Sequence, residues 1–300
     1  MITKRNYVRK ISFRVFRWLC RFVWGKGLAK LPLARRAYSF LYSITMPPNQ
    51  IVLGEFEGQK MYFDTNDKHG MTAQLFLGGL YEKYETNLFK RVVSEGMTVV
   101  DLGANIGYYT LLLAKLVGRG GKVFAFEPDP DNFSLLLKNV EANGYDNVIP
   151  VRKAVSNKTG ATKLFLCREN KGDHRIYDSH DGRESITVDV TTLDTFFENE
   201  QYPIDLIKCD IQGAEMAALQ GMTEIVLKNG SLKILIEFWP KVLQSFGFSP
   251  LEFLNKLTKY GFTLYTITSR EPWIKPVGVN EVVKMCKGEE FLNLFCQKST

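Results

Sequence analysis

The segment from Val99 to Gly107, VVDLGANIG, constrains the fold of this chain more than any other. Two apolar residues lead into Asp101, and Gly103 and Gly107 follow with three residues between them. A strand that ends in such a glycine turn allows positive φ and a close approach of the backbone to a ligand. The first amides of the helix that follows are expected to point toward that ligand. We therefore predict a strand, a tight turn and a helix that border a ligand site.

The spacing of the glycines distinguishes two classes of cofactor. Dinucleotide-binding proteins use G-x-G-x-x-G at this turn to seat a pyrophosphate, whereas this chain has D-x-G-x-x-x-G. A second apolar run, KVFAFEPDP, places Glu127 at a strand end, where a carboxylate can accept hydrogen bonds from both ribose hydroxyls. We therefore predict S-adenosylmethionine, a nucleoside without phosphate. Its predicted contacts are the turn and three strand-end acids: Asp101, Gly103, Ala104, Asn105, Gly107, Glu127 and Asp210.

Apolar runs and helical patterns alternate over the rest of the chain. Helices are predicted at Tyr108–Val117, Pro130–Asn143, Ala214–Lys228 and Pro250–Lys259, and later strands at 148–155, 204–211, 232–238, 261–268 and 291–297. This alternation predicts an α/β fold with a mostly parallel, Rossmann-like sheet and helices on both faces. Two extended runs, Ala161–Cys167 and Ser185–Thr191, predict a β-hairpin inserted between the third and fourth strands of that sheet.

The charge of the chain is concentrated at its start. The net charge is +7, but the first 44 residues hold eleven basic residues and no acid, which leaves 28 basic against 32 acidic residues over 45–300. The basic excess therefore belongs to one segment and argues against a nucleic-acid groove on the main body. We predict three parts: a basic, aromatic helical arm at 1–46, a small hairpin with helices at 47–95, and a Rossmann-like domain at 96–300.

The arm contains the sequence ISFRVFRWLCRFVW at 11–24, in which arginines fall on one side of a helix and aromatic residues on the rest. The run is too short and too charged to span a membrane. It can lie in the headgroup plane of an anionic membrane, or it can pack on the main domain with a solvated basic face. A second amphipathic piece follows at Leu28–Ile44.

The five cysteines indicate the compartment of the protein. Their number is odd and no C-x-x-C pair occurs, so neither a disulfide framework nor a zinc site is predicted. A reducing compartment fits this pattern. We expect a cytoplasmic protein that can bind peripherally at the inner face of the membrane.

Three further residues are candidates for binding the molecule that receives the methyl group of S-adenosylmethionine and for accepting a proton from it. Asp210 and Glu237 end the fourth and fifth predicted strands of the main sheet, where open α/β sheets bind ligands. His174 lies in the polar loop of the inserted hairpin and is a natural general base near pH 7, although it can equally be an exposed loop residue. We predict catalytic roles for His174, Asp210 and Glu237. Arg175, next to His174, can bind an anionic group.

The chain resembles the FkbM family of methyltransferases. The matching pieces are GLYEKYE at 79–85, VVDLGANIGYYTLLLA at 99–114, FAFEPDP at 124–130, TTLDTF at 191–196 and IDLIKCDIQGAE at 204–215. The resemblance implies a class I methyltransferase fold, S-adenosylmethionine as methyl donor, and a hydroxyl acceptor on a sugar, glycan, glycolipid or natural product. It also places Asp210 and Glu215 in the acidic motif of the family.

Two departures from the family pattern lie in this motif. Gln212 stands where the family commonly has an acid, and Cys209 replaces an aliphatic residue. Gln212 weakens the case for a metal-assisted mechanism, and no metal site is predicted. Glu215 can also serve only the dipole of its helix, since it lies in the first turn. The alternative functions are an RNA methyltransferase that uses the basic arm and a non-catalytic, membrane-associated binding module of the same fold.

Overall fold

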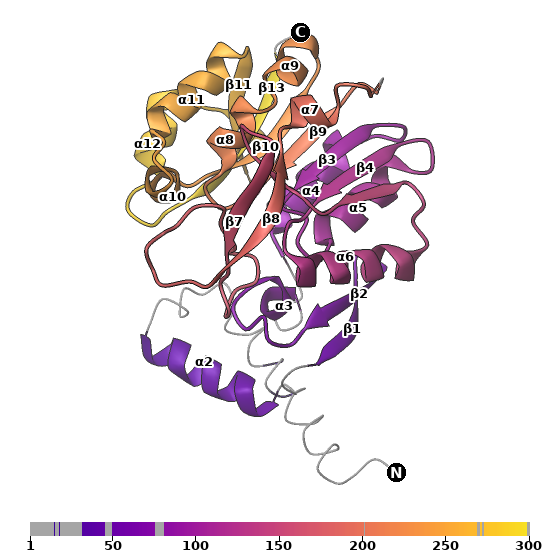
Figure 1. Ribbon diagram of the computed structural model, residues 1–300, viewed down its shortest axis with the longest axis vertical. Helices are drawn as coiled ribbons and strands as arrows, with labels where there is room; N and C mark the ends of the chain where they lie inside the picture. The colour runs from indigo at the N-terminus through magenta and orange to yellow at the C-terminus, as the bar shows by residue number, and fades with distance from the viewer. Residues whose placement is uncertain are drawn as a thin grey trace. The chain divides into compact units, whose positions relative to one another are not determined.

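The computed structural model describes residues 15, 18, 32–45, 50–75, 81–200, 202–268, 271 and 273–298 (Figure 1). The chain forms two compact units. One comprises Met1–Lys83 and Cys167–Gly172, and the other comprises Tyr84–Leu166 and Asp173–Thr300. The predicted boundaries near residues 46 and 95 stay predictions.

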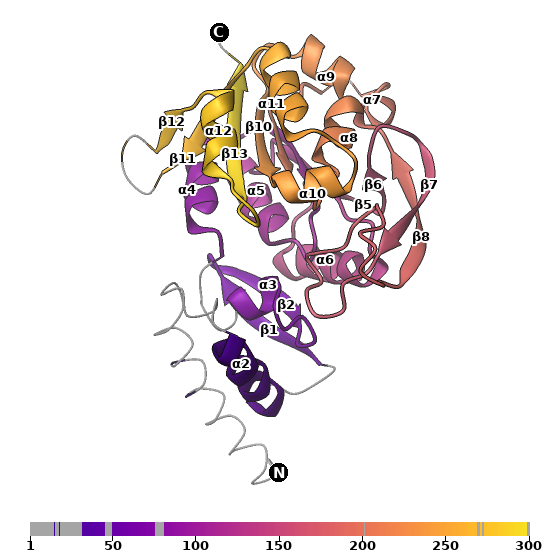
Figure 2. The same ribbon diagram turned by 90° about the vertical axis from the view of Figure 1, so that its left-hand side faces the viewer.

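An eight-stranded sheet, in the order β12-β11-β13-β10-β9-β3-β4-β5, forms the centre of the larger unit. Figure 2 shows its end formed by β10, β13, β11 and β12. Its strands are β3 (Thr98–Leu102), β4 (Lys122–Phe126), β5 (Val148–Val151), β9 (Leu206–Cys209), β10 (Lys233–Phe238), β11 (Phe262–Ile267), β12 (Ile274–Pro276) and β13 (Leu292–Lys298). From β10 to β5 all neighbours are parallel, whereas β13 runs antiparallel to both β10 and β11. The predicted mostly parallel sheet is confirmed.

Because β3, β4, β9 and β10 are parallel, their carboxyl ends meet at one edge of the sheet. That edge is where open α/β sheets bind their ligands. The residues at the ends of these four strands therefore share one region of the molecule, although β3 and β9 end more than a hundred residues apart in sequence. The site described below is built at this edge.

Side chains alternate between the two faces of each strand. Val100 of β3 and Ile207 of β9 belong to the large apolar core, which also contains Leu219, Val226 and Leu254 from three helices: α8 (Glu215–Gln220), α9 (Thr223–Lys228) and α11 (Pro250–Lys259). The opposite face is covered by α5 (Tyr108–Val117), which contacts β3 and β4. The predicted helices on both faces are therefore present.

The remaining helices of this unit are short or lie at its margins. They are α4 (Lys83–Val92), α6 (Pro130–Asn143), α7 (Leu193–Phe196), α10 (Pro240–Ser245) and α12 (Val279–Met285). Asp129 caps α6, because its side chain accepts a hydrogen bond from the amide of Asn132, and Pro130 fits the first helical position. These local signals explain why the predicted bounds of α6 are correct.

The predicted hairpin is present as β7 (Gly160–Phe165) and β8 (Ser185–Thr191), which pair antiparallel. It belongs to a separate three-stranded sheet, because β6 (Ala154–Val155) pairs with β8. The single strand predicted at 148–155 is therefore wrong. It divides into β5 and β6, since residues 154–155 leave the main sheet to join the hairpin.

The helix predicted at Ala214–Lys228 is also wrong as one element. It divides into α8 and α9 at Gly221. A Cβ atom at this position would lie 2.0 Å from the carbonyl oxygen of Ser156, so the neighbouring segment approaches too closely for any other residue. A tertiary contact overrides the local helical pattern here.

The smaller unit contains the helix α2 (Pro32–Thr45), the hairpin β1 (Ile51–Phe56) and β2 (Gln59–Asp64), and α3 (Met71–Ala73). The predicted hairpin and the second amphipathic helix are confirmed. Tyr42 of α2 donates to the carbonyl of Thr65. The helix predicted at 11–24 lies, except for residues 15 and 18, outside the described residues. No helix in the described ranges is long and apolar enough to cross a membrane.

Candidate active site

The turn after β3 has the backbone conformation that the sequence predicts. Gly103 has φ +76° and Gly107 has φ +97°, and Asn105 between them has φ +51°. Gly103 also approaches the end of β9 closely, because a Cβ atom there would lie 2.0 Å from the carbonyl oxygen of Asp210. The close approach that requires glycine is therefore to the protein's own backbone.

The amides of this turn are already used within the protein. Gly103 and Ala104 donate to the carbonyl of Phe126, and Gly107 donates to that of Ala104. The two amides between them donate to side-chain oxygens: Asn105 to Glu127 at 2.8 Å, and Ile106 to the side chain of Asn105 at 2.7 Å. The amides of residues 103–107 are therefore not free for a ligand, whereas the ligand-facing role expected of the first amides of α5, which begins at Tyr108, stays a prediction. Such a turn cannot cradle a phosphate, which agrees with the argument from glycine spacing.

Glu127 follows β4 and is only 5% exposed. One carboxylate oxygen accepts from the amide of Asn105 at 2.8 Å and the other from the amide of Asp129 at 2.9 Å. Burial raises the pKa of Glu127 to about 7, and these two hydrogen bonds partly oppose that shift. Each oxygen of a carboxylate has a further lone pair, so Glu127 can still accept hydrogen bonds from a ligand.

Asp101 is fully buried at the end of β3. It accepts a hydrogen bond from the hydroxyl of Thr110 on α5 at 2.7 Å, and its other oxygen lies 3.4 Å from the ammonium of Lys208. Its role as a cofactor contact stays a prediction, and the structure adds a role in packing β3 against α5 and β9.

Sequence reasoning missed Lys208. It lies inside the apolar strand β9 opposite Asp101, and it is 5% exposed. The signal was present, because a lysine within a run such as IDLIKCDI is rarely buried unless it is paired. Its partner could not be read from the sequence, since Asp101 is more than a hundred positions away.

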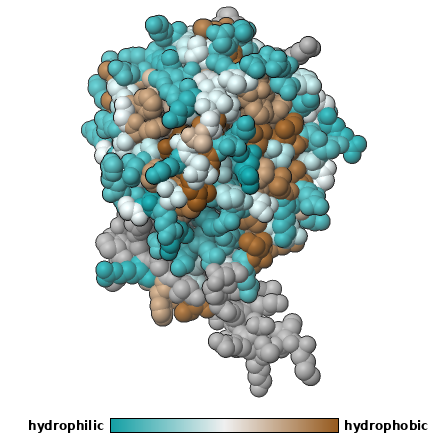
Figure 3. All heavy atoms as spheres, viewed as in Figure 1, coloured by the Kyte–Doolittle hydropathy of each residue, from teal (hydrophilic) through white to brown (hydrophobic). Residues whose placement is uncertain are grey.

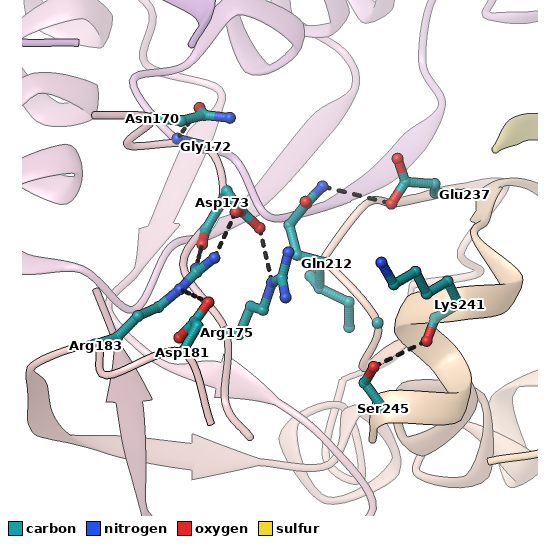
Figure 4. Close-up of polar contacts among 12 residues, drawn as sticks. Asn170, Gly172, Asp173, Arg175, Asp181, Arg183, Gln212, Glu237, Lys241 and Ser245 are labelled. Carbon is teal, nitrogen blue, oxygen red and sulfur yellow. Dashed lines mark hydrogen bonds and ion pairs between the residues drawn. The ribbon is translucent and has the colours of Figure 1, made fainter. Parts of the chain in front are cut away.

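The part of the site expected to bind the molecule that receives the methyl group is called the acceptor side. Its centre is formed by Asp210, Gln212 and Glu237. The Gln212 side-chain amide donates to Asp210 at 2.8 Å. It also donates to Glu237 at 3.4 Å (Figure 4). Gln212 has φ +54°, an uncommon conformation for a residue other than glycine. One amide therefore links the two predicted carboxylates, which lie at the carboxyl ends of the neighbouring parallel strands β9 and β10.

Glu215 points back into the turn that precedes α8. One of its oxygens accepts from the amides of Ile211 and Gly213, at 3.0 and 3.1 Å. It is 1% exposed, and burial raises its pKa to about 7. Glu215 thus holds the turn after Asp210 in place, which is more than the interaction with the helix dipole considered from sequence.

The loop between β7 and β8 brings His174 into the protein interior. Its side chain is 10% exposed, and its Nε2 lies 3.9 Å from the carboxylate of Asp129. His174 is therefore not an exposed loop residue. By contrast, the side chain of His180 in the same loop is 89% exposed.

Arg175 and Arg183 both contact Asp173 in this loop (Figure 4). The Arg175 guanidinium lies 5.8 Å from the ring of Tyr177 and 6.0 Å from that of Trp239. The loop therefore reaches the residues that follow Glu237 in β10. The loop therefore lies at the carboxyl-end edge of the eight-stranded sheet, although it connects two strands of the three-stranded sheet.

Among the buried donors of this region that have no hydrogen-bond partner within the described residues are the hydroxyl of Tyr177 and the indole nitrogen of Trp239. Burial raises the pKa of Tyr177 to about 12, so its hydroxyl keeps its proton. Unpaired buried donors cost free energy, about 1–3 kcal/mol each, and therefore favour a ligand or water that accepts from them.

S-adenosylmethionine fits the donor side of this region. Glu127 has lone pairs for the ribose hydroxyls, and the satisfied amides of the turn require no phosphate. The contact of Asp210, at the end of β9, with the cationic part of the cofactor stays a prediction. Among the described residues, no group of histidine, cysteine and acidic side chains is arranged to hold a metal ion.

The chain is similar in sequence to known methyltransferases. It is 32% identical over 125 residues to the hexuronic acid methyltransferase AglP of Haloferax volcanii, an alignment that covers 41% of this chain and 48% of that protein. It is 25% identical over 146 residues to Methyltransferase 1 of Beauveria bassiana, with 42% and 58% covered. The chain thus spans about half the length of these relatives.

A solved structure, M. jannaschii TYW2 in complex with AdoMet, aligns with a TM-score of 0.43 and 17% identity over 85% of this chain and 89% of that one. This similarity is too low to support an assignment. The model of the methyltransferase FkbM domain, in contrast, matches residues 101–264, which is more than half of the chain and includes the donor turn, Glu127, Asp210 and Glu237. The chain therefore belongs to the FkbM family of methyltransferases.

Proposed function

We propose that this protein transfers a methyl group from S-adenosylmethionine to a hydroxyl oxygen of a sugar or of a sugar-bearing molecule. The observation that carries the proposal is the pair of carboxylates, Asp210 and Glu237, bridged by Gln212 beside the donor turn. When bound, S-adenosylmethionine supplies a methyl group activated by its sulfonium. The protein then has to align a hydroxyl and accept its proton.

The acceptor side offers two candidates for the proton acceptor. Glu237 is 6% exposed and linked to Asp210 through Gln212. His174 has its Nε2 3.9 Å from the carboxylate of Asp129, whose charge would stabilise the imidazolium that forms when His174 accepts a proton. Asp210 orients the acceptor hydroxyl in either case.

The sugar class of acceptor is supported by the hydrogen-bonding groups near Arg175. The unpartnered groups of Tyr177 and Trp239 favour a bound molecule whose oxygen atoms accept hydrogen bonds. Asp210 and Glu237 favour one whose hydroxyl groups donate them. A polyhydroxylated molecule supplies both. The similarity to the hexuronic acid methyltransferase AglP supports the same class.

The experiment is methyl transfer from labelled S-adenosylmethionine to a panel of neutral sugars, uronic acids and simple alcohols, with the position of the methyl group identified in the product. We expect labelled sugars and no labelled simple alcohols. Transfer to RNA alone would contradict the proposal. The RNA methyltransferase and the non-catalytic module have no observation in their favour.

Two substitutions test the proton acceptor. The variants are Glu237→Gln and His174→Ala. Replacement of the residue that serves as base should lower the kcat of the enzyme about 100-fold or more. His180→Ala is the matched control, since that exposed histidine lies in the same loop. If both Glu237→Gln and His174→Ala retained near-normal turnover, neither residue would be the base.

We also propose that the basic arm and α2 bind an anionic membrane surface from the cytoplasmic side. In α2, Phe40 is 64% and Ile44 is 52% exposed, one helical turn apart, and apolar side chains come to the surface over this helix (Figure 3). The eleven basic residues of the first 44 supply the complementary charge. The free cysteines at positions 167, 209, 286 and 296 fit a reducing compartment.

Co-sedimentation with vesicles tests this second proposal. Full-length protein should bind vesicles that contain phosphatidylglycerol, and it should not bind vesicles of phosphatidylcholine alone. The double substitution Phe40→Ser/Ile44→Ser should abolish binding. Leu227→Ser is the matched control, because Leu227 is 61% exposed in the other unit. Equal binding by all three proteins would rule out α2 as the docking surface.

A further inference from the structure

Lys208 is a buried charge whose purpose the proposed reaction does not explain. Its ammonium lies 3.4 Å from Asp101 and 3.8 Å from Asp210, and it donates to the carbonyl of Gly103 at 3.2 Å. A longer contact of 3.5 Å reaches the carbonyl of Leu102. Taking an ammonium out of water is costly, and these contacts help to offset the cost, as does the ring of Tyr109, whose centroid lies 5.4 Å from the ammonium.

The contacts of Lys208 join two parts of the site. Asp101, Leu102 and Gly103 end β3 and begin the donor turn, whereas Asp210 follows β9 on the acceptor side. Asp210 is held from two directions, by Gln212 on one oxygen and by Lys208 near the other. The backbone reinforces the junction, because the amide of Asp210 donates to the carbonyl of Leu102.

We infer that Lys208 is a positioning residue that fixes the donor turn and the Asp210 carboxylate in one arrangement. It acts through Gly103 and Asp210 and does not touch the reacting atoms. The expected effect of Lys208 on turnover rests on the proposed function. The structural part of the inference, the rigid junction of the two strand ends, stands independently of any acceptor.

A simpler explanation is that Lys208 only neutralises the buried charge of Asp101. The two explanations differ in what a paired substitution restores. Lys208→Met alone leaves the Asp101 carboxylate buried without its cation, and this variant can unfold for that reason alone. Asp101→Asn/Lys208→Met removes both charges together and keeps both side-chain lengths, so the fold no longer has to bury an unpaired charge.

The first readout requires no acceptor. Hydrogen exchange, followed by mass spectrometry, should be faster in peptides that cover 99–107 and 206–213 in Asp101→Asn/Lys208→Met than in Asp101→Asn. Lys233→Met is the matched control: that lysine lies in β10 and contacts the carbonyl of Val92 at 3.5 Å, away from the carboxyl ends of the strands. Its exchange in both segments should equal that of the native protein.

The second readout is turnover at saturating S-adenosylmethionine. A misplacement of about 1 Å costs on the order of 100-fold, so the double variant should have a kcat about 100-fold below that of Asp101→Asn. Lys208→Arg, which keeps the charge, should recover part of the loss seen in Lys208→Met. Cofactor affinity, measured by calorimetry, separates weak binding from poor alignment.

Unchanged exchange in both segments of the double variant would overturn the inference, and so would a kcat equal to that of Asp101→Asn. Lys208 would then only balance charge. A protein that methylates no sugar at all would contradict the proposed function. Exchange in 99–107 and 206–213 would still decide whether Lys208 positions the two strand ends.

Discussion

The donor side and the acceptor side of the site are held by different kinds of interaction. On the donor side, Glu127 is fixed by two backbone amides, and the turn amides are satisfied within a few residues or by the adjacent strand. On the acceptor side, Asp210, Gln212 and Glu237 are held mainly by contacts between side chains. The donor side therefore depends on the backbone of the sheet, and the acceptor side depends on the identity of individual side chains.

This difference has a consequence for substitution. Changes on the donor side should alter stability and cofactor binding together. Changes on the acceptor side should alter turnover and leave stability almost intact. Three predictions test the contrast.

Gly103→Ala should have the largest effect. The added Cβ atom would meet the carbonyl oxygen of Asp210 at 2.0 Å, in a residue with φ +76°. We expect a loss of at least about 3 kcal/mol in the free energy of unfolding, measured with urea, and no measurable cofactor binding. Gly144→Ala is the control, because Gly144 has φ +67° with no atom within 4 Å of the added Cβ; it should cost about 1–2 kcal/mol. Equal losses would show that the close approach at Gly103 is unimportant.

Gln212→Gly should separate activity from stability. Glycine relieves the strained conformation at φ +54° but removes the amide that links Asp210 to Glu237. We expect kcat to fall about 100-fold through lost alignment, while the free energy of unfolding does not decrease. Cofactor affinity from calorimetry should stay the same. A parallel loss of stability would mean that the acceptor side also supports the fold.

The pH dependence of cofactor affinity should reveal Glu127. Because burial raises the pKa of Glu127 to about 7, the carboxyl group is protonated below that pH and loses capacity to accept ribose hydroxyls. If only the ionised form binds well, affinity should fall about tenfold for each pH unit below about 7. Calorimetry on Glu127→Gln should give a weaker affinity with little pH dependence. A native affinity that does not change with pH would exclude this role.

The raised pKa of Glu127 also determines whether the free energy of unfolding rises or falls with pH. Its folded pKa lies above the ordinary value for glutamate, so between the two values the folded state binds more protons than the unfolded state. Stability should therefore decrease as pH rises toward about 7, and Glu215, whose pKa is also raised to about 7, acts in the same direction. Urea unfolding of Glu127→Gln should show a smaller decrease over this range.

The sequence predictions were correct where the structure depends on interactions between residues close together in the chain, and wrong where it depends on contacts between distant residues. The bounds of α5 and α6 were predicted correctly, because caps, glycines and apolar spacing are local signals. The division of the helix at Gly221 was not, because it arises from a contact with Ser156, far away in the chain. The partner of Lys208 could not be predicted for the same reason, because Asp101 is also far away in the chain.

The sequence by itself determined the α/β alternation, the glycine turn and the strand-end acids Asp101, Glu127, Asp210 and Glu237, because each is encoded in a short run of neighbouring residues. Only the tertiary structure decided that Lys208 pairs with Asp101, that Gln212 links Asp210 to Glu237, and that His174 is buried against Asp129. These contacts exist because parallel strands bring their carboxyl ends to one edge, and a sequence does not state which distant side chains meet there.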